Sequence, residues 1–264
     1  PTAFAGTGTS IALPPVPLDT SATYYVSYYS IDYAGNTETQ QDITVRIDRT
    51  APTIEDDLPA GWTNDGSLKI TLGSSDTDSG PSQISYCVVT ATEGTCDTNP
   101  DVDGILGETA NSATVDIAAL YGIIPNGQTA EGLLFYRAED QVGNFAENSA
   151  LPIRIDRSTP STAINGDVIG WDTGWISSDV TITLTPTDTG SSVADTFACV
   201  DTDHPCIPPS SPLSFDVTMT EGSEGRQYVR YYSVDNSGNS EAINSVAIDI
   251  DKTQPSTTDD APVV

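Results

Sequence analysis

Hydrophobic and polar residues alternate along several short segments of the chain. In one stretch these segments are residues 68–72, 84–89, 113–117, 132–139 and 151–156. In the first of them Leu68, Ile70 and Leu72 fall on one side, with Lys69 and Thr71 on the other, as in a β-strand that buries one face. No segment keeps a helical period over three turns. The pattern therefore predicts an all-β protein with strands at the spacing of a sandwich.

One motif, Tyr-x-x-x-Asp-x-x-Gly-Asn, occurs at residues 28–36, 136–144 and 231–239. Its Gly can take the positive φ of a tight hairpin turn. Each copy is followed by a second alternating segment that ends in Asp and a basic residue, with Pro four positions after the Asp. These Pro residues are Pro52, Pro160 and Pro255. A repeat of about 100 residues is a whole domain, not a solenoid unit.

The repeat predicts the domain organisation. Residues 1–51 hold the second half of a domain, 52–158 and 159–254 are complete domains, and 255–264 begin a further domain or form a donated strand. The loop around 118–127 is the main difference between the complete copies. A half sandwich exposes strand edges and apolar faces. We therefore expect either that the chain is an excerpt of a longer array or that neighbouring subunits supply strands.

The order of the motifs resembles a known family. A Trp (Trp62 or Trp175) precedes a short Thr/Val strand, an Asp/Ser/Gly loop, the Tyr-to-Asn motif and the strand with its Pro linker. This succession resembles the tandem immunoglobulin-like domains of bacterial and archaeal surface proteins. The resemblance implies immunoglobulin-like β-sandwich domains in a linear array, located outside the cell. Members of that family form adhesin stalks, parts of S-layers and filaments, and accessory modules of secreted hydrolases.

The four cysteines form two local pairs, Cys87/Cys96 and Cys199/Cys206, at matching points of the two complete copies. A zinc site needs four converging ligands, whereas these pairs lie in different domains. We therefore expect disulfides, and with them an oxidising compartment.

The charge of the chain excludes several partners. Thirty-eight Asp and Glu face nine Lys and Arg, which gives a net charge of −29. Such a chain is repelled by nucleic acid and by anionic membranes. No apolar run reaches the ~18 residues that a membrane helix needs, so no membrane insertion is expected. An acidic surface also suits a protein adapted to salt.

Catalytic chemistry finds little support, and we expect no enzyme. The single histidine, His204, lies inside the second Cys loop and has no counterpart in the first copy. It is therefore interpreted as a loop residue and not as a member of a catalytic triad. Gly104–Gly107 lacks the Lys of a phosphate-binding loop.

Acidic residues at the domain junctions predict calcium. In a seven-stranded sandwich the linker, the loop after the second strand and the last hairpin turn meet at one end. The expected ligands are Asp48, Asp76, Asp78, Asp140 and Asn144 in the first copy, and Asp156, Asp188, Asp235 and Asn239 in the second. Ca²⁺ takes six to eight such hard oxygen ligands. The alternative is that these Asp residues only cap turns, as Asp commonly does without metal.

These features favour a structural role. The leading hypothesis is a repeat unit of an extracellular filament, sheath or adhesin stalk. It acts as a semi-rigid rod, has further copies or a longer array as partners, and can assemble by strand exchange. One alternative is a module that binds carbohydrate or protein through loop 118–131, with Tyr121, Ile123 and Ile124. Another is an accessory region of a secreted enzyme.

Overall fold

The computed structural model describes residues 7–8, 10–90, 112–148, 150–166, 174–202, 206, 208, 217–221 and 224–258. The chain divides into two compact units. The first comprises Pro1–Leu58, Lys69–Asp116 and Gly132–Pro152, and the second comprises Pro59–Leu68, Ile117–Glu131 and Ile153–Val264. The part of the chain that is described contains no helix long and apolar enough to cross a membrane.

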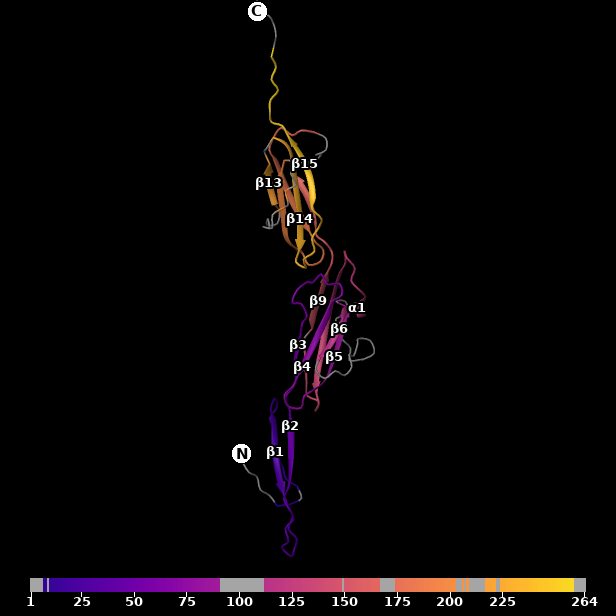
Figure 1. Cartoon of the computed structure of the whole chain (residues 1–264), viewed down its shortest axis with the longest axis vertical. Coiled ribbons are helices and arrows are strands. Elements are labelled where there is room, and N and C mark those ends of the chain that lie inside the picture. Colours follow the sequence, from indigo (N-terminus) through magenta and orange to yellow (C-terminus); the bar gives the residue numbers. More distant parts are fainter. Residues whose placement is uncertain are drawn as a thin grey trace, which may run out of the picture. The chain divides into compact units, whose positions relative to one another are not determined.

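The first unit begins with a two-stranded sheet. Strands β1 (Ser21–Tyr28) and β2 (Gln41–Asp48) pair antiparallel along their full length, from Ser21 opposite Asp48 to Tyr28 opposite Gln41 (Figure 1). The turn between them contains Gly35, which has a φ of 86°. Glycine takes this conformation without steric cost, as the motif predicts.

Most of the rest of the first unit belongs to a sandwich of two antiparallel sheets. One sheet has the order β3-β4-β6, and the other has the order β5-β7-β8 with β9 also pairing with β7. The strands are β3 (Thr53–Asp56), β4 (Lys69–Ser75), β5 (Pro81–Thr90), β6 (Ser112–Asp116), β7 (Thr129–Asp140), β8 (Phe145–Glu147) and β9 (Leu151–Asp156). This order of strands in two sheets is that of an immunoglobulin-type sandwich.

Alternation along the strands builds the core of this sandwich. Ile70 and Leu72 on β4, Val115 on β6 and Leu134 on β7 are fully buried. The Tyr136 hydroxyl donates a hydrogen bond to Asp56 Oδ2 at 2.9 Å and so ties β7 to β3. Burial, followed by the contact with Asp56, raises the pKa of Tyr136 well above its ordinary value.

The second unit includes the short segments Pro59–Leu68 and Ile117–Glu131. Helix α1 (Ile117–Tyr121) leads into residues 122–128. There the Ile124 N–H donates to the Gly66 carbonyl at 3.1 Å. A Cβ on Gly66 would lie 2.4 Å from the Ile124 carbonyl oxygen, so only glycine allows the two backbones to approach this closely.

The second unit also contains the second sandwich. Its sheets have the orders β10-β11-β13 and β12-β14-β15. The strands are β10 (Ser161–Gly166), β11 (Val180–Thr187), β12 (Val193–Asp201), β13 (Val217–Glu221), β14 (Gly225–Asp235) and β15 (Asn244–Ile250). The core includes Val180, Ile182, Leu184, Val229 and Ile250, all fully buried.

The prediction of an all-β protein with immunoglobulin-like sandwiches is confirmed by this topology. Two details differ. The strand expected over 113–117 ends at Asp116, because helix α1 begins at Ile117 inside the loop that distinguishes the copies. The short first strands β3 and β10 were not predicted, since Thr53–Asp56 is too short and too polar to show alternation. The predicted domain bounds stay a prediction, because the two compact units do not coincide with the sandwiches.

Replacing Ile182 by Ala tests the core assignment. Ile182 is fully buried, so we expect the free energy of unfolding of the second sandwich to fall by about 2–5 kcal/mol, through lost burial and the cavity left behind. Ile243, which is half-exposed, is the matched control, and its replacement by Ala should cost less than about 0.5 kcal/mol. Urea denaturation measures both, and equal losses for the two variants would contradict the assignment.

Candidate functional site

Among the described residues, carboxylates gather in two places, once in each unit. Asp48, Asp76 and Asp140 form one group, and Asp156, Asp188 and Asp235 form the other. Within each group, one oxygen from each residue lies within 4.8 Å of the others. The members occupy matching positions in the two copies: the end of the strand before the sandwich, the loop after the second strand, and the last hairpin turn. The repeat in sequence is thus a repeat in space.

Asp156 ends strand β9 and is completely buried. Its Oδ1 accepts the N–H of Ser158 at 2.9 Å, and its Oδ2 accepts the N–H of Ser191 at 2.6 Å. The Asp156 carbonyl accepts hydrogen bonds from the Ser237 hydroxyl at 3.0 Å and from Asn239 Nδ2 at 2.9 Å. The residue that leaves one sandwich is therefore held at three points by the loop and hairpin of the next.

Asp188 lies in the loop between β11 and β12. Its Oδ2 accepts the N–H groups of Gly190 at 3.1 Å and Ser192 at 2.8 Å. Its Oδ1 is inaccessible to water and has no hydrogen-bond partner. A Cβ on Gly190 would lie 2.3 Å from Asp156 Oδ2, so glycine is required for this loop to approach the linker carboxylate.

Asp235 ends strand β14 and is 2% exposed. Its Oδ1 accepts the N–H groups of Ser237 at 2.9 Å and Asn239 at 2.8 Å, while its Oδ2 accepts Asn239 Nδ2 at 2.8 Å. Gly238 completes the turn with a φ of 92°. Asn239 thus joins the hairpin carboxylate to the carbonyl of Asp156.

The first unit repeats these contacts. Asp48 Oδ1 accepts the N–H of Thr50 at 2.9 Å, and Oδ2 accepts the N–H of Ser79 at 2.9 Å. Asn144 Nδ2 donates to the Asp48 carbonyl at 3.3 Å. Asp76 Oδ1 accepts the N–H of Gly80 at 2.8 Å, as Asp188 accepts that of Ser192.

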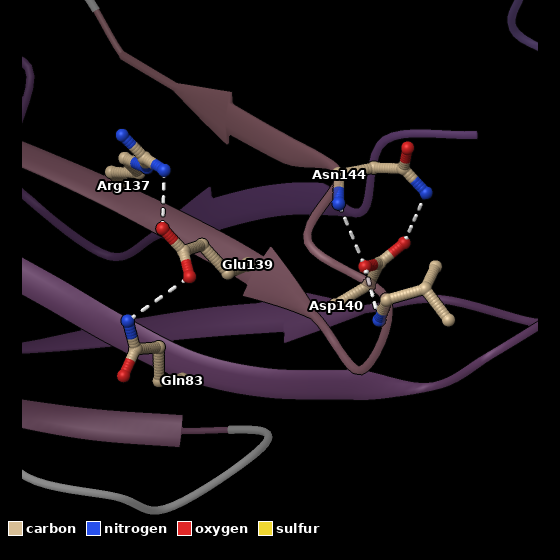
Figure 2. Close-up of polar contacts among 6 residues, drawn as sticks. Gln83, Arg137, Glu139, Asp140 and Asn144 are labelled. Atoms are coloured by element: carbon tan, nitrogen blue, oxygen red, sulfur yellow. Dashed lines mark hydrogen bonds and ion pairs between the residues drawn. The ribbon is translucent and has the colours of Figure 1, made fainter. Parts of the chain in front are cut away.

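Figure 2 shows the hairpin end of the first group. Asp140 accepts the Asn144 N–H at 2.9 Å and Asn144 Nδ2 at 2.6 Å. On the same strand, Glu139 accepts Gln83 Nε2 at 3.1 Å and pairs with Arg137 (Figure 2). Arg137, the basic residue in this view, therefore pairs with Glu139 and not with the buried carboxylate of Asp140. None of the ion pairs within the described residues includes a clustered Asp; they are Lys69–Asp116, Arg137–Glu139, Arg226–Asp249 and Lys252–Asp179.

The structure separates the predicted ligands into two classes. Six Asp residues converge, but Asp78 is not in the group, and its backbone N–H donates to Asp76 instead. Asn144 and Asn239 turn their amide nitrogens toward the carboxylates and so act as donors that brace the groups. The backbone donors Ser79 and Ser191 were missed, because a main-chain N–H leaves no signal in residue type.

The hairpin β1–β2 shows which part of this geometry is local. Asp32 Oδ1 accepts the N–H groups of Ala34 at 2.9 Å and Asn36 at 2.8 Å, and Oδ2 accepts Asn36 Nδ2 at 2.7 Å. Asp140 and Asp235 make the same bonds in their own turns, whereas the turn at Asp32 is exposed. The Asp–Asn turn therefore forms from its own residues. In the two carboxylate groups, the linker and loop carboxylates are additional to this turn.

The linker carboxylates have perturbed acidity. Burial by itself raises the pKa of Asp156, but hydrogen bonds from Ser158 and Ser191 outweigh it, and the pKa lies below its ordinary value. The pKa of Asp48 is lowered in the same way, by Ser79 and Thr50 against partial burial. The ionised form is thus favoured in both residues, in Asp156 although it is completely buried.

Cys199 and Cys206 form a disulfide. Cys87 is also disulfide-bonded, while Cys96 lies outside the described residues. His204 lies outside them as well.

The loop predicted as an alternative binding site is partly built into the fold. Ile124 is buried, and its carbonyl accepts Arg157 Nη1 at 2.5 Å. Ile123 is 65% exposed, and the side chain of Tyr121 lies outside the described residues. The Ile124 side chain is therefore part of the folded core and is withdrawn from solvent.

Comparisons with known proteins find no matching family model and no matching curated protein. Among solved structures, the chain is similar to fibronectin(III)-like modules of Clostridium thermocellum CbhA, with a TM-score of 0.35, 11% identity, and coverage of 78% of this chain and 100% of the other. It is also similar to the FN1–FN3 domains of chicken CNTN1, with a TM-score of 0.28, 10% identity, and coverage of 85% and 77%. A third structure is the sialic acid-binding region of a Streptococcus sanguinis SK1 adhesin, with a TM-score of 0.24, 11% identity, and coverage of 78% and 78%. These values are low, so the fold assignment rests on the sheet topology itself.

Replacing Asp156 by Asn tests the linker contact. The loss of the charged acceptor weakens the bonds to the N–H groups of Ser158 and of buried Ser191, which should cost about 1–3 kcal/mol at pH 7. Asp251→Asn is the matched control, because Asp251 makes the same turn bond to Thr253 but is exposed.

The stability that Asp156 contributes should decrease as the pH falls. Because the folded-state pKa of Asp156 is lowered, its contribution to stability is present above the ordinary Asp pKa and is lost as the pH falls through the folded value. Denaturant unfolding between pH 7 and pH 2 should therefore show a smaller loss on acidification in Asp156→Asn than in the wild type. Parallel pH profiles would contradict this origin of the stability.

Proposed function

We propose that this chain is a structural module of an extracellular surface array, in which each linker aspartate fixes the angle between consecutive domains. The observation that carries the proposal is that Asp48 and Asp156 are held by the same hydrogen bonds in the two copies, an arrangement that we call the linker clamp. Each of these residues ends a strand of one domain and is hydrogen-bonded by the loop and hairpin of the next. A flexible tether between domains would not need such contacts.

Two further features support a location outside the cell. The Cys199–Cys206 disulfide suits an oxidising compartment. The net charge of −29 keeps a surface exposed to salt well solvated. A filament, a sheath or an adhesin stalk is an array that needs domains at fixed angles.

We further propose that the two carboxylate groups bind Ca²⁺. In the second unit, Asp156 and Asp235 are buried next to Asp188, and no base among the described residues pairs with them. Asp188 Oδ1 is buried without a partner, which is costly for a charged oxygen unless a cation contacts it. Carboxylate and carbonyl oxygens are the ligands that Ca²⁺ prefers. Such an ion would join linker, loop and hairpin.

The fixed angle is tested by removing both linker carboxylates. In the variant Asp48→Ala/Asp156→Ala we expect small-angle scattering to show a broader distribution of interatomic distances than in the wild type, because consecutive domains are released. The matched control is Asp32→Ala/Asp251→Ala, which removes the same charge from two exposed turns. Identical scattering from the wild type and both variants would refute the proposed role of the linkers.

Calcium binding is tested by calorimetric titration of metal-stripped protein and by thermal unfolding. At a calcium concentration of 100 Kd, one site should stabilise its unit by about 2.7 kcal/mol relative to protein in chelator. Asp76→Asn should abolish binding in the first unit, whereas Asp78→Asn, in the same loop but outside the group, should retain it. The absence of both a binding heat and a shift in melting temperature would exclude the calcium sites and leave the hydrogen-bonded clamp untouched.

A further inference from the structure

The second unit contains a polar cavity beside the linker that follows strand β9. Its volume is about 660 Å³, within the range of about 300–1,000 Å³ that small-ligand sites have. The side chains that line it are those of Asn64, Asn126, Arg157, Thr159, Asn239 and Ser240, all of which belong to this unit. No carboxylate among the described residues lines it, although the chain has 38 Asp and Glu. The cavity therefore differs in charge from the chain as a whole.

Arg157 is fixed in place within this lining. Its Nη1 donates to the Ile124 carbonyl at 2.5 Å, and its main-chain N–H donates to the Gln128 carbonyl at 2.9 Å. A Cβ on Gly66 would lie 2.7 Å from Arg157 Nη1, so glycine leaves room for the guanidinium. A guanidinium has five N–H donors, and Arg157 forms no ion pair with a described residue. Donors that the fold does not use are therefore held ready at one wall of the cavity.

The neutral side chains of the lining are also available to a ligand. Asn64, Asn126 and Thr159 are exposed, and their side chains have no hydrogen-bond partner in the described part of the chain. A Cβ on Gly238 would lie 3.7 Å from Asn64 Nδ2, which places this amide beside the last hairpin. An amide and a hydroxyl can each donate and accept a hydrogen bond. The cavity thus offers both kinds of group.

The repeat shows which part of this arrangement belongs to the fold. In the first unit, Arg49 Nη1 donates to the Val16 carbonyl at 2.6 Å, and the Arg49 N–H donates to the Thr20 carbonyl at 3.2 Å. These are the contacts of Arg157, 108 residues earlier in the chain. The braced arginine is therefore a structural element of both copies and is not by itself the mark of a binding site.

Three of the other lining positions differ between the copies. They are polar in the second unit, where they are Asn126, Thr159 and Ser240. The aligned residues of the first unit are all apolar and are Leu18, Ala51 and Phe145. Leu18 is 69% exposed and Phe145 is 48% exposed, so the fold tolerates apolar side chains at these positions even in water. The polar lining is thus a property that the second copy has in addition to the shared frame.

The chemistry of the lining selects the class of ligand. Most small-molecule sites are lined mainly by apolar side chains, whereas amides, hydroxyls and a guanidinium suit a polar ligand. An anion is disfavoured, because Asn239 connects the cavity to Asp235 and to the carbonyl of Asp156. The three carboxylates of that group stay negative even with one Ca²⁺ bound. A neutral molecule with many hydroxyl groups avoids this repulsion and can both donate to and accept from the lining.

We propose that this cavity binds a short neutral oligosaccharide, with Asn64, Asn126 and Thr159 hydrogen-bonded to sugar hydroxyl groups and Arg157 donating to their oxygens. Asn126 belongs to the loop 118–131, in which the sequence suggested a binding site as an alternative to a purely structural role. The inference goes beyond the proposed function, since it gives the structural module a ligand of its own.

Nuclear magnetic resonance of the full-length chain tests the site. The ¹⁵N-labelled protein is titrated with maltotriose, mannotriose and chitotriose at constant calcium concentration. We expect at least one of these sugars to shift the side-chain amide signals of Asn64 and Asn126 in a saturable way. The signals of Asn36, in the exposed hairpin of the first unit, are the control and should stay in place.

A double substitution tests the lining. Asn126→Leu/Thr159→Ala gives the second unit the residues of the first, so the fold should be kept. The affinity for the sugar should fall by about tenfold, because two hydrogen-bonding groups are lost. Gln128→Leu/Ser161→Ala is the matched control, since both residues are exposed in the same loop and linker but do not line the cavity. It should bind as the wild type does, and melting temperatures check that both variants are folded.

Three outcomes would overturn the proposal. In the first, none of the three sugars shifts the signals of Asn64 and Asn126. In the second, trigalacturonate shifts these signals and the neutral sugars do not, which would assign the cavity to an anion. In the third, the two double variants lose affinity equally. None of these results affects the linker clamp, whose scattering test uses different residues.

Discussion

A carboxylate withdrawn from water must have its oxygens satisfied, and the ends of both sandwiches are arranged around this requirement. Asp156 is completely buried, yet hydrogen bonds from Ser158 and Ser191 keep its pKa low. The loop that provides the Ser191 N–H has to approach so closely that Gly190 cannot carry a side chain. The position of the linker, the course of the loop and the choice of glycine thus follow from one buried charge.

The three hairpin turns separate local from long-range causes. Asp32, Asp140 and Asp235 make the same bonds to the Asn four residues later, whether the turn is exposed or buried. The turn therefore forms from its own sequence. What the sandwiches add is the linker Asp, whose carbonyl accepts the amide of Asn144 or Asn239. The contact that the turn cannot form by itself therefore comes from a residue far away in the chain.

This distinction explains how much the sequence could predict. Alternation and the repeated Tyr-to-Asn motif were sufficient for the long strands and for the six Asp residues that converge, since each is a local pattern in a known topology. The choice between Asp76 and Asp78 could not be made, because both are acidic and two residues apart in one loop. The donors Ser79 and Ser191 act through the main chain and leave no trace in composition. Helix α1 is a single short turn without a detectable period.

The contact between the first strand and the last hairpin differs between the two sandwiches. Thr162, Ser233 and Glu241 are hydrogen-bonded to one another in the second, whereas Ile54, Ala138 and Ala146 stand at the aligned positions of the first. This difference bears on a problem that every tandem array of similar domains has. Strands of one copy fit the sheets of another almost as well as their own, because the fold and the alternation are shared. A set of three positions that is polar in one copy and apolar in the next opposes such exchange. A threonine packed against Ala138 and Ala146 would leave its hydroxyl without a hydrogen-bond partner. An isoleucine packed against Glu241 would leave the Glu241 carboxylate without one. The difference in polarity at these partly buried positions provides such discrimination.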